Sequence, residues 1–302
     1  LAHTCMEPMN ALANVSGGKC EIWTGSQNPL GGRHAVAEAL GMDVENVTFN
    51  NHMMGGGFGR RATPDATIQV AKISRASGHP VKLIWSREED VQHDHYRPAV
   101  LSNFSAVLGE DGKPTAWENQ FVDKHEPVEA PHILYDVANQ FVHYTDSPTH
   151  VPFGPWRSVD HSQHGFFTES FIDELAYEAG SDPYQYRREL LNSKPRHLKV
   201  LDLAATEAQW SQELGENRGR GISLQESFGT IVAEVVEVTV ENGEVSVDRV
   251  VVAVDAGFAV PPDGLTAQME SGVVYGLTAA LYGEIAIEDG KVKQGNFDSY
   301  RA

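Results

Sequence analysis

A run of glycines between a predicted strand and a predicted helix constrains the fold of this chain most strongly. Residues 47–50 read as a short strand, and four of the five residues 55–59 are glycine, with Phe58 among them. Residues 63–65, Thr-Pro-Asp, then supply an N-cap, a proline at the first helical position and an early acid, which predicts a helix to about Ser77. The glycine run therefore leads a strand into a helix N-terminus.

The chemistry of residues 55–59, called the glycine loop below, favours binding of an anion. Glycines remove Cβ bulk, so successive backbone N–H groups can approach an anionic group closely. Arg60 and Arg61 add positive charge directly after the loop. The spacing matches neither the dinucleotide motif Gly-x-Gly-x-x-Gly nor a loop ending in Gly-Lys-Ser/Thr. The alternative is a tight turn with exposed arginines, but Phe58 is hard to explain as a turn residue, so we favour a backbone cradle for a phosphorylated cofactor.

Other segments show strand and helix patterns along the whole chain. We expect strands at residues 21–24, 81–85, 101–108, 115–123, 230–240 and 245–254, helices at 33–40, from 166 to about 180, at 183–191, 201–210 and 265–281, and a hairpin at 289–290. Residues 127–155 predict an ordered surface excursion, and residues 194–220 a domain junction. The sequence predicts an α+β fold with mixed or antiparallel sheets flanked by helices, in two domains, 1–205 and 206–302.

Composition and charge exclude several classes of function. A formal net charge of −19 over 302 residues repels nucleic acid and anionic lipid surfaces. No stretch approaches the ~18 uncharged apolar residues of a membrane-spanning helix. Cys5 and Cys20 lack the paired spacings of a zinc or iron–sulfur site, so we expect two reduced, partly buried thiols, with a single disulfide as the alternative. The chain itself is expected to hold no cluster.

Three further polar side chains are candidates for ligand binding. Gln27 follows a strand on a turn, and Arg157 precedes a helix and could clamp a phosphate. Gln268 has the small neighbours Gly264 and Gly272 on its helix face. Each also has a structural explanation: Gln27 as a turn residue, Arg157 as a surface residue and Gln268 as part of a helix-packing face. The residues alone leave these alternatives open.

Two histidines are the only candidates for metal ligation. His93 and His95 would share one face of an extended backbone, where two imidazoles can bind a metal ion. No third ligand lies close in the sequence, so a solvated pair is favoured and no metal ligand is assigned. A zinc-dependent module remains a minor alternative. No Gly-x-Ser-x-Gly segment is present, so a serine-hydrolase triad has no nucleophile.

Six separated segments carry a resemblance to a known family: residues 6–10 (MEPMN), 24–29 (TGSQNP), 54–61 (MGGGFGRR), 87–90 (REED), 166–176 and 267–272 (AQMESG). Over essentially its whole length the chain resembles the molybdenum-binding large subunit of the xanthine dehydrogenase and aldehyde oxidase family, in the branch of the isoquinoline 1-oxidoreductase β-subunits. The resemblance implies two molybdopterin-binding domains. It also implies that several residues contact the cofactor: Gln27, Gly56, Gly57, Phe58, Gly59, Arg157 and Gln268. The positive charge beside the glycine loop adds Arg60 to these expected contacts.

The resemblance implies an oxidoreductase that hydroxylates an electron-poor carbon, in an N-heteroaromatic ring or an aldehyde, with oxygen from water. The expected cofactor is molybdenum with molybdopterin cytosine dinucleotide, and electrons would leave through a separate small iron–sulfur subunit. The family's base, a glutamate in a Gly-Glu-Pro segment, and its Met-Gly-Gln-Gly loop have no match here, so no catalytic residue is assigned. We therefore expect a middle fragment of such a large subunit, inactive alone.

Two further points concern the substrate and whether the chain belongs to an enzyme. Ala62 stands where xanthine-oxidising relatives have a substrate-binding glutamate, so xanthine is not the expected substrate. The alternative to an enzyme is a non-catalytic binding or scaffold module of the same fold that has lost the cofactor. The compartment is not predicted.

Overall fold

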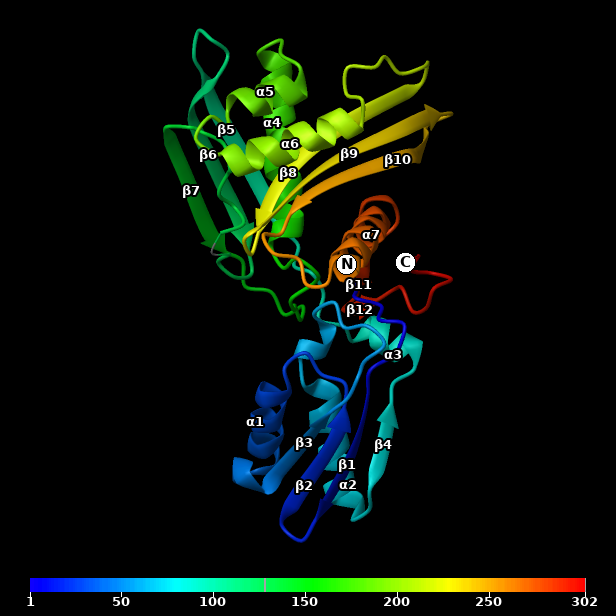
Figure 1. Cartoon of the computed structure of the whole chain (residues 1–302). Coiled ribbons are helices and arrows are strands. Elements are labelled where there is room, and N and C mark those ends of the chain that lie inside the picture. The colour runs from blue at the N-terminus through cyan, green and yellow to red at the C-terminus, as the bar shows by residue number, and fades with distance from the viewer. Residues whose placement is uncertain (128, 302) are drawn as a thin grey trace. The chain divides into compact units, whose positions relative to one another are not determined.

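The computed structural model describes residues 1–127 and 129–301, and they form two compact units (Figure 1). Unit 1 comprises residues 1–98, 149–159 and 275–302, and unit 2 comprises residues 99–148 and 160–274. Both units are therefore assembled from segments far apart in the sequence. Neither boundary falls at residue 205, and the predicted junction at residues 194–220 lies inside unit 2.

Unit 1 is built on a mixed four-stranded sheet in the order β3-β2-β1-β4. Its strands are β1 (Asn10–Ser16), β2 (Lys19–Thr24), β3 (Val47–Asn51) and β4 (Val81–Ile84). β2 pairs antiparallel with β1 and parallel with β3. Helices α1 (Pro29–Leu40) and α2 (Asp65–Ser77) pack on the sheet, because the fully buried Ile22, Val36 and Val70 belong to one core. The predicted β-α-β unit is confirmed.

The ends of α1 and α2 follow from local chemistry. The Asn28 side chain caps α1 by accepting from the N–H of Gly31, and both helices end at a glycine in the left-handed region. The prediction that Thr63 caps α2 is wrong. Pro64 occupies the N-cap position without a side-chain hydrogen bond, because Thr63 ends the short 3₁₀ turn η2 (Arg60–Ala62) that leaves the glycine loop.

The remainder of unit 1 consists of short elements. These are η1 (Val44–Asn46), α3 (Arg87–Gln92) and the predicted hairpin of β11 (Ile287–Glu288) and β12 (Lys291–Val292). Cys5 and Cys20 are both buried and free, as expected. Helix α7 (Pro262–Leu281) contributes its residues from Tyr275 onward to unit 1 and its earlier residues to unit 2.

In the described part of unit 2, two three-stranded sheets and three complete helices share one core (Figure 1). One sheet holds β5 (Leu101–Leu108), β6 (Pro114–Asp123) and β7 (Asn139–Asp146), and the other is the antiparallel β8 (Arg218–Ser227), β9 (Thr230–Glu241) and β10 (Glu244–Asp255). The helices are α4 (His161–Glu178), α5 (Pro183–Glu189) and α6 (Pro195–Glu207). Trp117, Ile172, Leu201 and Leu224, from strands and helices alike, are buried together. The α+β fold class is confirmed.

Two segments of unit 2 depart from the sequence prediction. The expected surface excursion at residues 127–155 contains β7, which pairs in parallel with β6. β7 is an edge strand of mostly exposed residues, so it lacks the alternation that marks a half-buried strand. The expected junction at residues 194–220 contains α6 and the start of β8, whose Arg and Gly residues resemble a linker. No helix in the described part of the chain is long and apolar enough to cross a bilayer.

Candidate functional site

The glycine loop adopts a backbone that requires glycine at two positions. Gly56 and Gly59 have φ values of +96° and +106°, and Phe58 between them is also left-handed at +52°. A Cβ atom on Gly59 would lie 1.2 Å from the carbonyl oxygen of Pro155. The loop therefore passes directly against the segment that contains Arg157, and no larger residue fits at position 59.

The loop leaves three consecutive backbone donors without a partner. The N–H of Gly59 donates to Gln27 Oε1 at 2.9 Å, and the N–H of Gly55 donates to the Glu7 carboxylate. Among the residues that the structure describes, none accepts from the N–H groups of Gly56, Gly57 or Phe58. A run of free N–H groups on partly left-handed backbone is a known anion-binding arrangement. The loop thus fits the phosphorylated, anionic part of a cofactor.

Gln27, one of the sequence candidates for ligand binding, lies directly on the glycine loop. A Cβ atom on Gly57 would lie 2.5 Å from Gln27 Oε1, so glycine is also needed there for the amide to approach. Because Oε1 accepts from Gly59, the amide Nε2 is the end left over as a donor, and the side chain is exposed. Gln27 and the three free N–H groups therefore form one set of donors.

Arg60 and Arg61 are buried, which contradicts the alternative of a tight turn with exposed arginines. They are 1% and 2% exposed. Arg60 Nη2 lies 2.6 Å from Asp65 Oδ2, and its Nε lies 3.0 Å from Asp94 Oδ1. The guanidinium is thus occupied by two carboxylates inside unit 1. The Arg60 side chain therefore faces these carboxylates, and its cofactor contact stays a prediction.

Arg61 supports the loop from its inner side, a role that the sequence did not indicate. Its Nε donates to the carbonyl of Gly56 at 2.9 Å. Its Nη2 donates to the carbonyls of Glu7 and Pro8 at 2.8 and 3.2 Å. Because these carbonyls face the arginine, the peptide that follows Gly56 is fixed in orientation. Arg61 therefore connects the loop to the segment before β1.

Ionic contacts behind the loop lower the pKa values of two carboxyl groups, those of Asp65 and Asp94. Burial alone would raise the pKa of Asp65, but hydrogen bonds from His95 and Arg60 lower this pKa to about 2. Burial opposes ionisation of Asp94 as well, yet the His3 hydrogen bond at 2.9 Å and the charge of Arg60 hold the pKa of Asp94 below its usual value. Both carboxylates are therefore ionised at neutral pH and compensate the buried arginine.

An aromatic stack brings Arg157 to the glycine loop. The Tyr275 ring lies between Phe58 and Trp156, with ring centroids 4.9 and 4.6 Å apart. The Arg157 guanidinium carbon lies 5.7 Å from the Tyr275 centroid, and the Tyr275 hydroxyl donates to the carbonyl of His3 at 3.2 Å. Tyr275 was not a candidate in the sequence, because an aromatic residue in a helical pattern is typical of ordinary packing.

The remaining sequence candidates are Gln268, His93 and His95. Gln268 lies in the part of α7 that belongs to unit 2, so its cofactor contact stays a prediction. His93 Nδ1 lies 3.5 Å from Glu89, and His95 Nε2 lies 3.5 Å from Asp65. In the described residues, neither histidine belongs to a group of three potential metal ligands. The zinc-module alternative therefore loses its basis.

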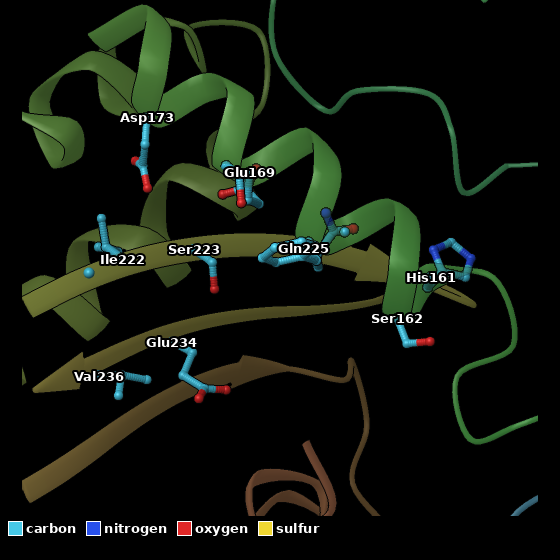
Figure 2. A pocket seen from close by; sticks show the side chains of 13 residues that line it. His161, Ser162, Glu169, Asp173, Ile222, Ser223, Gln225, Glu234 and Val236 are labelled. Atoms are coloured by element: carbon cyan, nitrogen blue, oxygen red, sulfur yellow. The ribbon is translucent and has the colours of Figure 1, made fainter. Parts of the chain in front are cut away.

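Unit 2 contains a separate pocket of about 560 Å³ (Figure 2). Side chains from α4, β8 and β9 line it, and none of the predicted site residues is among them. Two of its acids are compensated, since Glu169 and Asp173 on α4 lie 2.9 and 2.5 Å from the buried Arg187. Glu234 on β9 differs, because burial raises its pKa without an opposing cation. The pocket is thus acidic and distinct from the glycine loop.

Replacing Glu234 measures how much its buried, ionised carboxylate lowers the free energy of unfolding. Its raised pKa favours the folded state at pH values below the ordinary glutamate pKa, and this contribution is lost as pH rises. We expect Glu234→Gln to raise the free energy of unfolding by about 1 kcal/mol at pH 7 and to have no such effect at pH 4. Urea unfolding at both pH values measures this, with the exposed Glu244→Gln as control. A loss of stability at pH 7 would contradict it.

Comparison with known protein families identifies the chain. Residues 1–191 and residues 172–302 each match a family described as the molybdopterin cofactor-binding domain. The chain belongs to this family. The two matched regions overlap, so the predicted boundary at residue 205 stays a prediction.

Individual relatives refine the assignment. The β-subunit of isoquinoline 1-oxidoreductase from Brevundimonas diminuta is 31% identical over 98% of this chain, which spans 41% of that protein. A nicotinate dehydrogenase polypeptide of Pseudomonas putida is 29% identical over 99% of this chain, which spans 28% of it. The structure of a Cu,Mo-CO dehydrogenase matches 99% of this chain and 65% of its own with a TM-score of 0.84 at 12% identity, which shows the fold.

Together these findings confirm the resemblance to the molybdenum-binding subunits of the xanthine dehydrogenase family. They also confirm a fold of two molybdopterin-binding domains, and the relatives are oxidoreductases. The chain spans less than half the length of either relative named from sequence. What the whole protein oxidises is therefore a separate question.

Proposed function

We propose that this chain forms part of the cofactor-binding large subunit of a molybdenum hydroxylase that oxidises an N-heteroaromatic compound or an aldehyde, with water as the oxygen donor. One observation carries the proposal: among the described residues nothing accepts from the N–H groups of Gly56, Gly57 and Phe58, and Gln27 is held beside them by its hydrogen bond from Gly59. The relatives named for isoquinoline, nicotinate and aldehyde oxidation support the substrate class.

The residues of this chain bind and position the cofactor. Gly56, Gly57 and Phe58 donate backbone hydrogen bonds to its anionic part, and Gln27 donates through its amide. Arg60 and Arg61 keep the loop in its donor-presenting conformation through buried contacts. When bound, the molybdenum–pterin group supplies the two-electron redox chemistry. The half-buried Arg157 adds a positive charge for a phosphate close to the Tyr275 stack.

Three finer assignments belong to the same proposal. The cofactor is the cytosine dinucleotide form of molybdopterin, Gln268 contacts its pterin, and a small iron–sulfur subunit receives the electrons. No residue of this chain is assigned as the general base. We therefore propose that turnover requires the longer protein and that this chain alone binds but does not oxidise.

Metal analysis of the full-length protein that carries this chain tests the proposal. Gln27→Ala removes one donor and the acceptor for Gly59, so we expect about a tenfold or greater loss of bound molybdenum. The exposed Gln212→Ala is the matched control and should retain the wild-type content. Dye-linked oxidation of isoquinoline, nicotinate and an aromatic aldehyde identifies the substrate class.

The same experiment separates the enzyme from the non-catalytic alternative. A scaffold module would carry no molybdenum in the full-length protein and would reduce no dye with any of the three substrates. Equal molybdenum content in the wild type and Gln27→Ala would contradict the role given to the glycine loop. Molybdenum without oxidation of any of the three compounds would contradict the substrate class alone.

A further inference from the structure

A second group of potential ligands lies in unit 2, away from the glycine loop's residues in the sequence. Asp123 ends β6, His125 follows two residues later, and Asp160 directly precedes α4. One oxygen of each aspartate and one ring nitrogen of His125 all lie within 4.8 Å of one another. His125 Nε2 lies 3.0 Å from Asp160 Oδ2. The chain thus gathers two carboxylates and an imidazole at one point.

Hydrogen bonds to neighbouring groups do not satisfy both aspartates. Asp160 occupies the N-cap position of α4, yet its side chain accepts no hydrogen bond from the helix backbone: Oδ1 accepts from Gln163 Nε2 at 3.2 Å, and Oδ2 faces His125. Asp123 is fully buried, and its Oδ2 has no hydrogen-bond partner among the described residues. A buried carboxylate oxygen without a partner is costly, and a cation would remove that cost. Burial and the neighbouring Asp160 also raise the pKa of Asp123.

His164 provides a further unpaired group beside this cluster. It lies one turn into α4, is fully buried, and neither ring nitrogen has a hydrogen-bond partner in the described part of the chain. Its charged neighbours include Asp160 and His125. A buried imidazole without any partner is unusual unless it adjoins a ligand or water. It is a candidate for a fourth ligand after a rotation of its ring.

We propose that Asp123, His125 and Asp160 bind a divalent transition-metal ion and that this ion links the end of β6 to the start of α4. A set of one imidazole and two carboxylates suits Zn²⁺ and Mn²⁺, whereas Mg²⁺ prefers oxygen ligands and water. Zn²⁺ binds more tightly than Mn²⁺ to such a set. Each ligand is on unit 2, so the site needs no residue from unit 1.

Titration of the chelator-treated chain with Zn²⁺ or Mn²⁺ tests this site. We expect one equivalent to bind by calorimetry, and the melting temperature to rise by about 5 °C or more at a hundredfold excess over Kd, with no comparable rise for Mg²⁺. His125→Gln and Asp123→Asn should each weaken Zn²⁺ binding at least tenfold. The control His143→Gln alters an exposed histidine on β7 and should bind as the wild type does.

Several outcomes would overturn the site. One is the absence of saturable Zn²⁺ and Mn²⁺ binding to the wild-type chain, and another is unchanged affinity in His125→Gln. If Asp123→Asn does not fold, His125→Gln alone tests the site. The His125 side chain is one-third exposed, so replacing it leaves no buried cavity. The electron paramagnetic resonance spectrum of bound Mn²⁺ reports binding without reference to stability. None of these measurements depends on molybdenum, so the glycine-loop proposal stands or falls separately.

Discussion

Gly59→Ala is expected to lower the free energy of unfolding of the chain by about 3–5 kcal/mol. The new methyl group would overlap the carbonyl oxygen of Pro155, which lies only 1.2 Å from the Cβ position, and alanine disfavours a φ of +106°. The loop must therefore move away from the Pro155 segment. In the full-length protein the three free donors would move with it, and bound molybdenum should fall below a tenth of the wild-type content.

Gly78→Ala is the matched control for that substitution. Gly78 ends α2 with a φ of +68°, but nothing lies within 4 Å of a Cβ atom placed there. It should therefore show only the backbone cost of about 1 kcal/mol and keep its molybdenum. Chemical unfolding of both variants separates steric overlap from backbone strain. Equal losses of stability in the two variants would show that the close contact with Pro155 does not exist.

Arg60→Met should lower the free energy of unfolding nearly as much as Gly59→Ala does, because it leaves the carboxylates of Asp65 and Asp94 without their buried cation. Removing one partner of a buried ion pair costs about 3–5 kcal/mol. The surface pair of Arg33 and Glu45 provides the control, since Glu45 is 84% exposed and Glu45→Gln should cost less than about 1 kcal/mol. Urea unfolding at pH 7 measures both variants.

The pH dependence of the Arg60→Met effect identifies its cause. The folded pKa of Asp65, about 2, lies below the ordinary aspartate value. Its ion pair therefore contributes fully above about pH 4 and is lost as pH falls through about 2. The stability difference between wild type and Arg60→Met should shrink over that interval. A difference that stays constant from pH 7 to pH 2 would show that packing, and not charge, holds Arg60 in place.

Elements with strong local signals were predictable from the sequence. The helices expected at residues 33–40 and up to about Ser77, and the strands expected at 230–240 and 245–254, rest on short-range features, and the structure confirms them. β1 and β7 were not predicted. β1 buries only Ala11 and Ala13, and β7 is a mostly exposed edge strand, so their assignment depends on partners that lie elsewhere in the chain.

The sequence indicated which residues could donate hydrogen bonds at the site, but not how their side chains are arranged in the fold. The spacing of the glycines and the turn at Gln27 indicated donors, and the structure brings them together at Gly59. The direction of the arginine side chains was not predictable, because Asp94 is over thirty residues from Arg60 and its contact depends on the tertiary fold. Tyr275 was missed for the same reason. Local charge indicates where a site lies but not which groups face it.

The Tyr275 stack has a consequence for the order of events during synthesis. Phe58 leaves the ribosome more than two hundred residues before Tyr275, the ring on which it rests. At roughly 5–20 residues per second, this interval is about 10–40 s. Throughout that time the nascent glycine loop lacks one of the surfaces that support it. If the glycine loop binds the cofactor as proposed, we therefore expect binding only after α7 has been translated.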